Sequence, residues 1–500
     1  TDTGVVPHLL QKYYNGNLVE AVGLAVARLE GSFALGIICT EHPDTLVAAR
    51  SFSPLIIGLG EGENYIASDV TAIVSKTRDI IYIDDGEIAE LTSGGVTLFD
   101  KNGDAKKYTV SHVNWNVAAA EKGGYDHFMM KEINEQPRAF EQTVMSRIKN
   151  GQIVFDDLKL DAKALNDINR ITIVACGSAY HAGVVGKYVI EEMLRIPCDV
   201  DLASEYRYRN PITDSHTLTI IISQSGETAD TLAALNEAKR RGSHTLAIVN
   251  VVGSSIAKAA DDVIYTWAGP EIAVATTKGY TTQLAVFYII AIAIAYAKST
   301  ISDDDTSQYI KFIKGSMPSG EIDKIQEDLL RLPELISETL LLNDKIKGMA
   351  KHSVGEDSLF FIGRNIDYAV ALEASLKLKE ISYIHSEAYA AGELKHGTIS
   401  LIEEGRTVIA LACQEAFFDK LVSNIKEVHA RGAYVIACAN EGDNAINEVC
   451  EESILVPRVH PLLKASIEVV PFQLYAYYVA LYRGCDIDKP RNLAKSVTVE

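Results

Sequence analysis

A turn rich in hydroxyl groups follows an apolar run near the middle of the chain. Residues 220–222 are all isoleucine, and a helix-forming segment at 231–241 comes after the turn. The backbone N–H groups of such a turn converge at a helix start, where the helix dipole adds about half a positive charge. Its polar side chains exceed what N-capping requires, so the pattern predicts a phosphate site. These side chains are Ser223, Gln224, Ser225 and Thr228.

A second concentration of reactive side chains lies on a predicted helix. Glu373, Lys377 and Glu380 are spaced at i, i+4 and i+7, so two carboxylates and one amine share a face. On an exposed helix they would form only a ladder of ion pairs, worth a few tenths of a kcal/mol per pair. The residues that follow, 381–397, add two histidines and two further glutamates. This density favours acid–base chemistry.

A glycine and a hydroxyl group, Gly177 and Ser178, follow another predicted strand at 170–176. Ligands of open α/β sheets bind at such strand ends. Cys176 is a possible nucleophile there, but the only candidate base nearby in the sequence is His181. A buried, unreactive cysteine is therefore favoured.

The C-terminal residues, 488–500, permit two interpretations. Chain ends are usually frayed. Composition alone does not distinguish a frayed tail from a folded one that closes an active site, so both remain open at this point.

The elements that position these side chains form two similar sets. Apolar runs at 170–176, 217–222, 245–249 and 262–267 are separated by helix-length segments. After a helical connector between residues 303 and 350, runs at 358–363, 407–413, 433–439 and 453–456 repeat the pattern. Continuous apolar strands separated by helices predict parallel sheets covered on both faces.

The repeat also aligns at single residues. Gly177 matches Gly363 and Glu205 matches Glu393, and the two separations differ by only two residues. This spacing indicates a tandem α/β domain rather than a solenoid, with chance alignment of two generic βαβ units as the alternative. In the second copy the turn reads Cys-Gln-Glu-Ala at 413–416, without the serines and with an added carboxylate. Only the first copy is therefore expected to hold phosphate.

The leading part of the chain has a different pattern. Short β-forming runs alternate with turns at 31–39, 45–49, 54–59, 64–69, 80–84, 86–91 and 95–99. Connections as short as the turn at 84–86 favour hairpins and antiparallel pairing. A helical segment at 126–150 follows, with a start or break at 136–137. We therefore expect a β-rich unit at 1–118, a linker and entry helix at 119–150, and α/β domains at 151–315 and 316–500.

Composition restricts the class of function. The 500 residues include 47 Lys+Arg against 67 Asp+Glu, a formal charge of −20, which argues against nucleic-acid binding. The longest apolar run, 284–297, is shorter than the roughly 20 residues that cross a bilayer, and we expect a core helix there instead of a membrane span. Seven scattered cysteines predict neither a disulfide framework nor a zinc site. No export signal is visible, so the expected compartment is the cytoplasm.

Taken together, the sequence resembles the glutamine–fructose-6-phosphate aminotransferase (isomerising) family, the glucosamine-6-phosphate synthases. The matching strings are SQSGET at 223–228, KEISYIH at 379–385, AAGELKHG at 390–397 and PRNLAKSVTVE at 490–500. The resemblance covers the whole chain, and the last two strings are long and specific. It implies a glutaminase domain that releases ammonia from glutamine, followed by two tandem sugar-isomerase (SIS) domains. Together these would convert fructose 6-phosphate and ammonia into glucosamine 6-phosphate.

The resemblance implies a role for each matching residue. The side chains expected to hold the sugar phosphate are Ser223, Gln224, Ser225 and Thr228. Those expected to contact the rest of the sugar are Ser178, Val274, Thr276 and Ala494. Lys495 would form a Schiff base with the ketone carbon, and Glu380, with Lys377 beside it, would move a proton between the first two sugar carbons. His396 would open the sugar ring from a neighbouring subunit, which implies at least a homodimer.

These roles make demands on the site. At pH 7 the neutral form of an unperturbed lysine lies roughly 4.6 kcal/mol above the charged form. Lys495 is therefore expected to have a pKa lowered by burial or by a cation such as Arg491. Glu380 is expected to have a raised pKa, so that it can take and return a proton. No metal or other cofactor is implied, because the Schiff base serves as the electron sink.

The sequence departs from the family pattern in two places. Ser178-Ala179 stands where the family commonly has Thr-Ser, so a hydroxyl is lost, whereas Thr276 replaces a frequent serine and keeps it. The family's glutaminase begins with a nucleophilic cysteine, but this chain begins Thr1-Asp2-Thr3. These residues resemble an internal glutaminase segment in which Asp2 helps to bind glutamine, and not a threonine nucleophile. We therefore expect an incomplete amino-terminal-nucleophile glutaminase domain that does not hydrolyse glutamine by itself.

Two alternatives were weighed against the synthase. An SIS-domain sugar-phosphate deaminase or isomerase would have no need of the β-rich leading segment. A non-catalytic phosphosugar sensor would be expected to carry a basic DNA-binding module, and the sequence shows none.

Overall fold

The computed structural model describes residues 2–31, 33–51, 53, 55–68, 70–113, 121–149, 152–155, 158–159, 167–299 and 317–497. The chain forms two compact units. The first comprises residues 1–123 with two short segments, 227–229 and 496–500, and the second comprises 124–226 with 230–495.

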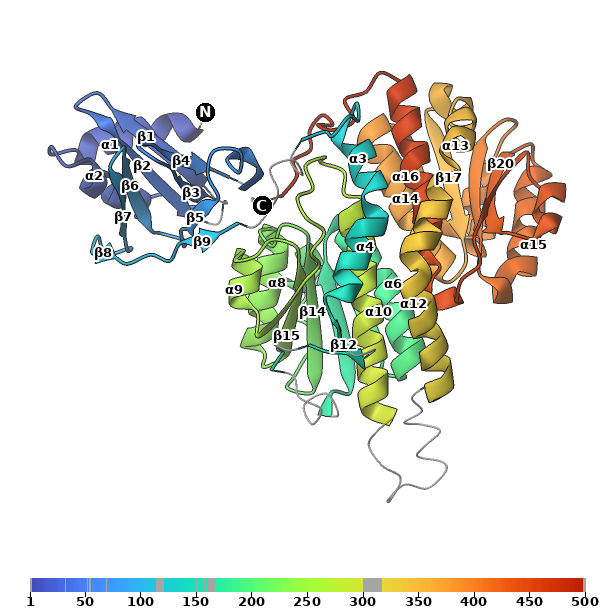
Figure 1. Cartoon of the computed structure of the whole chain (residues 1–500). Helices are drawn as coiled ribbons and strands as arrows, with labels where there is room; N and C mark the ends of the chain where they lie inside the picture. The colour runs from blue at the N-terminus through green and yellow to red at the C-terminus, as the bar shows by residue number, and fades with distance from the viewer. Residues whose placement is uncertain are drawn as a thin grey trace, which may run out of the picture. The chain divides into compact units, whose positions relative to one another are not determined.

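The first unit is built on two antiparallel sheets (Figure 1). One sheet has the order β1-β2-β6-β7-β8, with β1 (Phe33–Cys39), β2 (His42–Ser51), β6 (Ile88–Thr92), β7 (Gly95–Phe99) and β8 (Ala105–Lys106). The other has the order β4-β3-β5-β9, with β4 (Asn64–Ala67), β3 (Ile56–Leu59), β5 (Asp79–Tyr82) and β9 (Ser111–His112). Alternate residues of β2 face opposite sides, as strand geometry requires. Ala48 packs with Ile57 of the other sheet, whereas Val47 packs against Val22 of helix α2 (Leu18–Val26).

The antiparallel β-rich unit was predicted from sequence, and two details were wrong. The turn at 84–86 does not close a hairpin, because β5 and β6 belong to different sheets. There the chain crosses from one sheet to the other, and Gly86 N donates to Arg50 O (2.9 Å). The helices α1 (Val5–Tyr13) and α2 were not expected.

The second unit contains the first parallel sheet, with the order β13-β12-β14-β15-β16. Its strands are β12 (Arg170–Ala175), β13 (Cys198–Leu202), β14 (Thr217–Ser223), β15 (His244–Val249) and β16 (Asp262–Tyr265). Ile220 and Ile222 belong to the core beneath α6 (Gly177–Leu194) and α10 (Lys278–Ser299). Ile221 faces the opposite core, beneath α8 (Ala229–Arg240). Both faces are thus covered, which is why the strand sequence lacks alternation.

The second parallel sheet repeats this topology with the order β18-β17-β19-β20-β21. Its strands are β17 (Ser358–Gly363), β18 (His385–Ala390), β19 (Thr407–Ala412), β20 (Tyr434–Asn440) and β21 (Glu452–Val456). Helices α14 (Ile366–Ser382) and α16 (Ala465–Tyr482) lie on the face toward the first copy, and α15 (Phe418–His429) covers the other face (Figure 1). The expected tandem repeat is therefore confirmed, although one edge strand of each sheet, β13 and β18, was missed.

Several helices connect the two copies through one continuous core. The predicted break in the entry segment occurs at Glu135, between α3 (Phe128–Asn134) and α4 (Gln136–Met145). The connector forms α12 (Ser319–Leu340) and α13 (Asn343–Met349). The remaining short elements are α7 (Ala203–Tyr206), α9 (Ser255–Ala259), β10 (Ile148–Lys149), β11 (Gln152–Ile153), and the 3₁₀ turns η1 (Asp2–Gly4), η2 (Val70–Ala72), η4 (His352–Gly355), η5 (Glu393–His396), η6 (Thr398–Leu401), η7 (Glu415–Phe417), η8 (Asn444–Glu448) and η9 (Pro461–Leu463).

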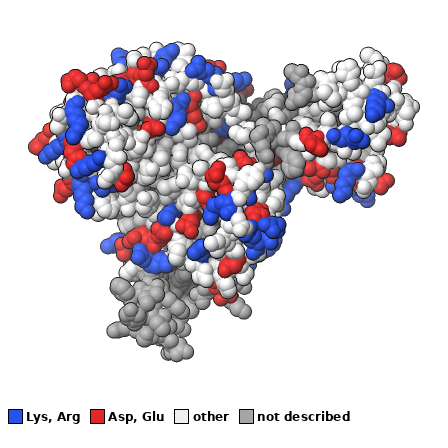
Figure 2. Space-filling view, turned by 180° about the vertical axis from the view of Figure 1, so that it is seen from behind, with Lys and Arg blue, Asp and Glu red and all other residues white. Residues whose placement is uncertain are grey.

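Helix α10 contains the apolar run noted in the sequence. By length and composition alone, Lys278–Tyr296 could cross a membrane, but 89% of its most apolar window is buried inside the structure. It packs against α4 and α6, as a core helix of the first copy would. On the molecular face drawn in Figure 2, acidic and basic side chains are interspersed without a broad field of one sign.

Candidate active site

The turn after β14 is held in one shape by its own polar groups. Gly226 N donates to Ser223 Oγ (3.0 Å), which closes the turn. The turn is also fixed from outside, because Asn250 N donates to Gln224 O (3.1 Å) and Ile256 N donates to Gly226 O (3.0 Å). Gly226 has φ +68°, and a Cβ there would lie 2.0 Å from Ser254 Oγ, so only glycine fits. The strand, turn and helix start of the sequence prediction are thus present.

The C-terminal amine is held by three acceptors. Lys495 Nζ donates to Glu271 Oε2 (2.6 Å), to Ala273 O (2.9 Å) and to Thr276 Oγ1 (3.4 Å). The Lys495 side chain retains 25% exposure, so the amine lies at the edge of the protein interior. Its immediate charged neighbour is an anion, whereas the sequence analysis expected a cation. Arg491 instead lies over the ring of Tyr383, with its guanidinium carbon 4.1 Å from the ring centroid.

Glu271 holds Lys495 in place, and the sequence analysis did not identify it. We call Lys495, Glu271 and the other two acceptors of the amine, Ala273 O and Thr276, the lysine corner. Its side chain is fully buried. Its Oε1 accepts from Thr277 N and Gly279 N, both at 2.9 Å. Burial alone raises the pKa of Glu271, but the Lys495 ammonium and these hydrogen bonds lower it. Glu271 is therefore held as a carboxylate.

The turn after β14, where the sequence predicts a phosphate site, lies next to the lysine corner. A Cβ placed on Gly279 would lie 2.9 Å from Glu271 Oε2, 3.1 Å from Thr276 Cγ2 and 3.2 Å from Gln224 Cγ. Side chains from the turn after β14 and from the segment before α10 therefore meet around Gly279.

The C-terminal tail is folded through residue 497. Val274 N donates to Asp488 O (3.0 Å), and the Asp488 carboxylate accepts from Phe128 N and Met129 N, each at 3.0 Å. Arg491 N donates to the hydroxyl of Tyr383 (2.9 Å). These bonds fix the tail ahead of Lys495, and Lys495 is itself held by Glu271 and Ala273 O, so the tail is folded over this stretch and not frayed.

Helix α14 of the second copy carries the predicted acid–base residues Glu373, Lys377 and Glu380. Lys377 Nζ lies 2.5 Å from Glu380 Oε2 and 3.5 Å from Glu373 Oε1. The Lys377 side chain is buried, and Glu380 remains 21% exposed. Burial alone lowers the pKa of Lys377, but Glu380 and Glu373, with a smaller contribution from Glu271, raise it. The contribution of Glu271 indicates that the α14 face and the lysine corner share one electrostatic environment.

Glu373 also connects the two copies. Ser178 Oγ donates to Glu373 Oε1 (2.8 Å), and His181 Nδ1 lies 2.8 Å from Glu373 Oε2. Both partners belong to the first turns of α6, where the first copy's opening strand ends. The expected strand-end residue Ser178 is thus tied to the α14 face through one buried carboxylate.

A second buried glutamate lies behind the lysine corner. Glu132 Oε1 accepts from Ile272 N (2.5 Å) and Ala273 N (3.2 Å), while its Oε2 has no hydrogen-bond partner among the described residues. Burial and the nearby Glu271 carboxylate raise the pKa of Glu132. Neither glutamate could be found from spacing, because they meet only when α3 packs beside the segment before α10.

Other candidates lie outside this cluster. His396, in η5, is exposed, and no hydrogen bond or ion pair joins it to another described residue. Ala494 is exposed beside Lys495, Val274 is half-buried, and Asp2 lies in η1 of the first unit. Cys176 accepts a long hydrogen bond from Thr231 Oγ1 (3.8 Å), and burial raises the pKa of its thiol, as expected for an unreactive cysteine.

The matching turn of the second copy is occupied by a side chain of the protein. Cys413 N and Gln414 N both donate to Asp367 Oδ2, at 2.9 Å and 3.1 Å. A buried side chain of the protein therefore already accepts the N–H groups at the start of this turn. This arrangement supports the expectation that only the first copy holds phosphate.

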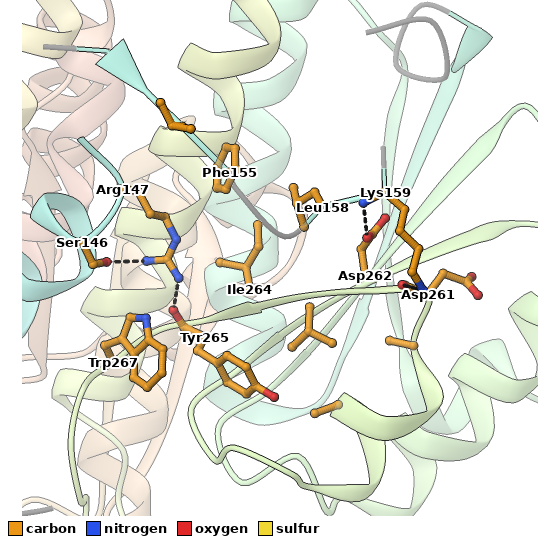
Figure 3. Close-up of a pocket in the computed structure, with 14 residues that line it drawn as sticks. Ser146, Arg147, Phe155, Leu158, Lys159, Asp261, Asp262, Ile264, Tyr265 and Trp267 are labelled. Carbon is orange, nitrogen blue, oxygen red and sulfur yellow. Dashed lines mark hydrogen bonds between the residues drawn. The ribbon is translucent and has the colours of Figure 1, made fainter. Parts of the chain in front are cut away.

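A cavity of about 650 Å³ lies elsewhere, along the edge strand β16 (Figure 3). Its polar groups are paired within the protein: Arg147 donates to Tyr265 O, and Lys159 N donates to Asp262 Oδ1 (2.6 Å). The described residues that line it include none of the predicted site residues. It therefore has no part in the site above.

Comparisons with known proteins agree with this architecture. The SIS domain family model matches residues 164–293 and 354–483, so the chain is a double SIS-domain protein. The glutamine–fructose-6-phosphate aminotransferase [isomerizing] of Clostridium tetani is 54% identical over 501 residues, covering 100% of this chain and 80% of the relative. The enzyme of the same name from Thermus thermophilus is 43% identical over the same length. The C-terminal domain of glucosamine-fructose-6-phosphate aminotransferase from Francisella tularensis superposes with a TM-score of 0.68 at 36% identity, covering 74% of this chain and 100% of that domain. The chain belongs to the glutamine–fructose-6-phosphate aminotransferase (isomerising) family.

Proposed function

We propose that this chain carries out the amination and isomerisation steps of glucosamine 6-phosphate synthesis from fructose 6-phosphate. The observation that carries the proposal is the proximity of Lys495 and Glu271 to Gln224 of the phosphate turn. Family membership over the whole chain supports it further. Because the relatives match through the β-rich leading unit as well, the synthase is favoured over a deaminase or isomerase without a glutaminase part.

In the proposed complex the phosphate lies on the turn after β14. The residues that bind it are Ser223, Gln224, Ser225 and Thr228, and those that contact the sugar are Ser178, Val274, Thr276 and Ala494. Lys495 attacks the C2 carbonyl with loss of water, and ammonia then displaces the lysine from the resulting Schiff base. Glu380 removes a proton from C1 and returns it to C2, while the Lys377 ammonium holds the carboxylate in place.

Substrate binding must disturb the resting pair at the lysine corner. Lys495 can attack only after losing a proton, and its ammonium is held by Glu271 at 2.6 Å. The sugar therefore has to replace contacts that the amine makes with Glu271, Ala273 O and Thr276. Glu271 is the adjacent acceptor and keeps the amine aimed at the sugar.

We propose that His396 opens the sugar ring in the active site of a neighbouring subunit, so that the active species is at least a homodimer. Its exposure in the single chain supports this role. The proposed parts are a portion of a glutaminase domain at 1–118, with Asp2 as a glutamine contact, a linker and entry helix at 119–150, and SIS domains at 151–315 and 316–500. All seven cysteines are unpaired, which supports a reducing compartment such as the cytoplasm.

The proposal is tested with fructose 6-phosphate and ammonium, measuring glucosamine 6-phosphate for the wild-type chain, for Lys495→Ala and for Lys489→Ala. Lys489 is an exposed lysine of the same tail and serves as the matched control. We expect product from the wild type and from Lys489→Ala only. Equal rates for the wild type and Lys495→Ala would remove Lys495 from the chemistry.

A further inference from the structure

A buried cluster in the second SIS domain takes no part in the proposed reaction. Cys413 directly follows β19, Cys438 lies in β20, and Glu468 lies in the first turn of α16. One ligand atom from each residue lies within 4.8 Å of the other two, and all three residues are buried. Sequence analysis found no zinc pattern because the three ligands come from separate elements and none of the cysteines lies close to another in the chain. We call these residues the Cys413–Cys438–Glu468 cluster.

The spacing of the two thiols fits tetrahedral coordination. Cys413 Sγ and Cys438 Sγ are 3.7 Å apart. Two sulfur ligands at about 2.3 Å from a tetrahedral Zn²⁺ ion are separated by about 3.8 Å. The two sulfur atoms would thus need almost no movement to bind one ion.

The carboxylates around the thiols have unused acceptors. Neither Glu468 oxygen has a hydrogen-bond partner among the described residues, and Asp367 Oδ1 has none either. Asp367 Oδ2 is fixed by the two N–H groups of the turn after β19, which orients the carboxyl group. Buried carboxylate oxygens without partners are costly, and they are rare in native structures.

A buried lysine, Lys464, lies at the start of the helix that carries Glu468. Its ammonium donates to Pro457 O (2.7 Å). Two thiols and one carboxylate, all buried and within 4.8 Å of one another, form a donor set suited to a divalent, thiophilic cation.

We propose that the Cys413–Cys438–Glu468 cluster binds one Zn²⁺ ion through two thiolates and one carboxylate. Binding releases the thiol and carboxyl protons to solvent and changes no oxidation state, so no other reactant is required. The ion would join β19, β20 and the start of α16, the helix that leads into the tail with Lys495.

The test uses the full chain, purified with reductant and freed of metal by a chelator. Co²⁺ is the probe, because tetrahedral thiolate coordination gives it intense visible bands and a sulfur-to-metal charge-transfer band. We expect saturation at one equivalent for the wild type and for Cys198→Ser, which alters a buried cysteine of the first copy. Cys413→Ser with Cys438→Ser should lose the charge-transfer band and weaken binding by at least about 100-fold. Zn²⁺ should displace Co²⁺ and raise the Tm of the first two proteins only.

The double substitution could lose metal binding because it misfolds. A variant that keeps both thiols separates this effect from the loss of a metal ligand. Glu468→Gln should retain the charge-transfer band but bind Co²⁺ more weakly than the wild type. Three results would overturn the proposal: no thiolate band in the wild type, an equal band in the double variant, or no change in affinity for Glu468→Gln. A Cys413–Cys438 disulfide as the only modification, with no metal bound by the reduced protein, would also overturn it.

Discussion

At the scale of single residues, the resting state of Lys495 is the most informative feature. The sequence analysis expected a cation that would promote the neutral amine, but the structure pairs Lys495 with the buried Glu271. Anchoring the amine among three acceptors fixes its position before substrate arrives. In the proposed mechanism, pairing with Glu271 thus positions the nucleophile, and activation follows when the sugar displaces that pairing.

Replacing Glu271 tests the hypothesis that pairing with Glu271 positions Lys495. Glu271→Gln keeps the size of the side chain but removes the anion, so we expect the ammonium-dependent kcat to fall by about 100-fold. Loss of a charged hydrogen bond should lower the unfolding free energy by about 1–3 kcal/mol. Steady-state kinetics and denaturant unfolding measure the two effects, with Glu237→Gln on α8 as a control for a surface ion pair. An unchanged kcat with reduced stability would limit Glu271 to a structural role.

Glu132 should make stability depend on pH. Burial and Glu271 raise its pKa in the folded state, while Lys495 and Lys278 oppose the rise. Between its unfolded value and this raised value the folded chain holds a proton that the unfolded chain has released. The contribution of Glu132 is therefore fully present at low pH and is lost as pH rises through the folded pKa.

Glu132→Gln, which does not titrate, should remove this dependence. From about pH 5 to about pH 8 the wild type should lose stability more steeply than the variant, by up to about 1.4 kcal/mol per pH unit. Denaturant unfolding at several pH values measures the slope. Glu141→Gln, exposed on α4, should keep the wild-type slope. Parallel curves for the wild type and Glu132→Gln would show that Glu132 is ionised in the folded protein.

At the scale of elements, the turn after β14 depends on one glycine. Gly226→Ala would impose both a left-handed backbone and a collision with Ser254, so we expect a loss of more than about 1 kcal/mol and a higher KM for fructose 6-phosphate. Gly242 at the end of α8 is a matched control, since it has φ +86° but nothing within 4 Å of its Cβ position. Gly242→Ala should cost stability without changing KM. A normal KM for Gly226→Ala would indicate that the turn does not bind the phosphate.

Most elements of the fold could be predicted from the sequence, and the failures have physical reasons. Strands buried on both faces, such as β14 and β19, are continuous apolar runs and were recognised. The edge strands β13 and β18 carry polar residues, CDVDL and HSEAYA, and give no such signal. In the candidate site, local strings predicted the turn after β14 as a phosphate site and the α14 face as an acid–base region, and both roles stay predictions. Glu271 and Glu132 escaped because an isolated glutamate carries no local pattern, and its importance arises only from tertiary packing.

At the scale of the whole molecule, the proposed site is complete only in an oligomer. If His396 acts on the partner's substrate, Lys495→Ala and His396→Asn chains should each be inactive but should complement when mixed. In random heterodimers one of the two sites has both residues, so activity should recover to about one quarter of the wild-type value. Refolding or co-expression of the two variants provides the mixture. No recovery in verified heterodimers would show that both residues must come from the same chain.

The carboxylate of Asp367 bears on the number of substrate molecules per chain. The turn after β19 corresponds to the turn after β14, but its N–H groups at Cys413 and Gln414 already donate to the Asp367 side chain. We therefore expect the second copy not to bind a phosphosugar. Calorimetric titration should therefore saturate at one sugar phosphate per polypeptide, and the second copy is free to specialise as the support for the catalytic tail.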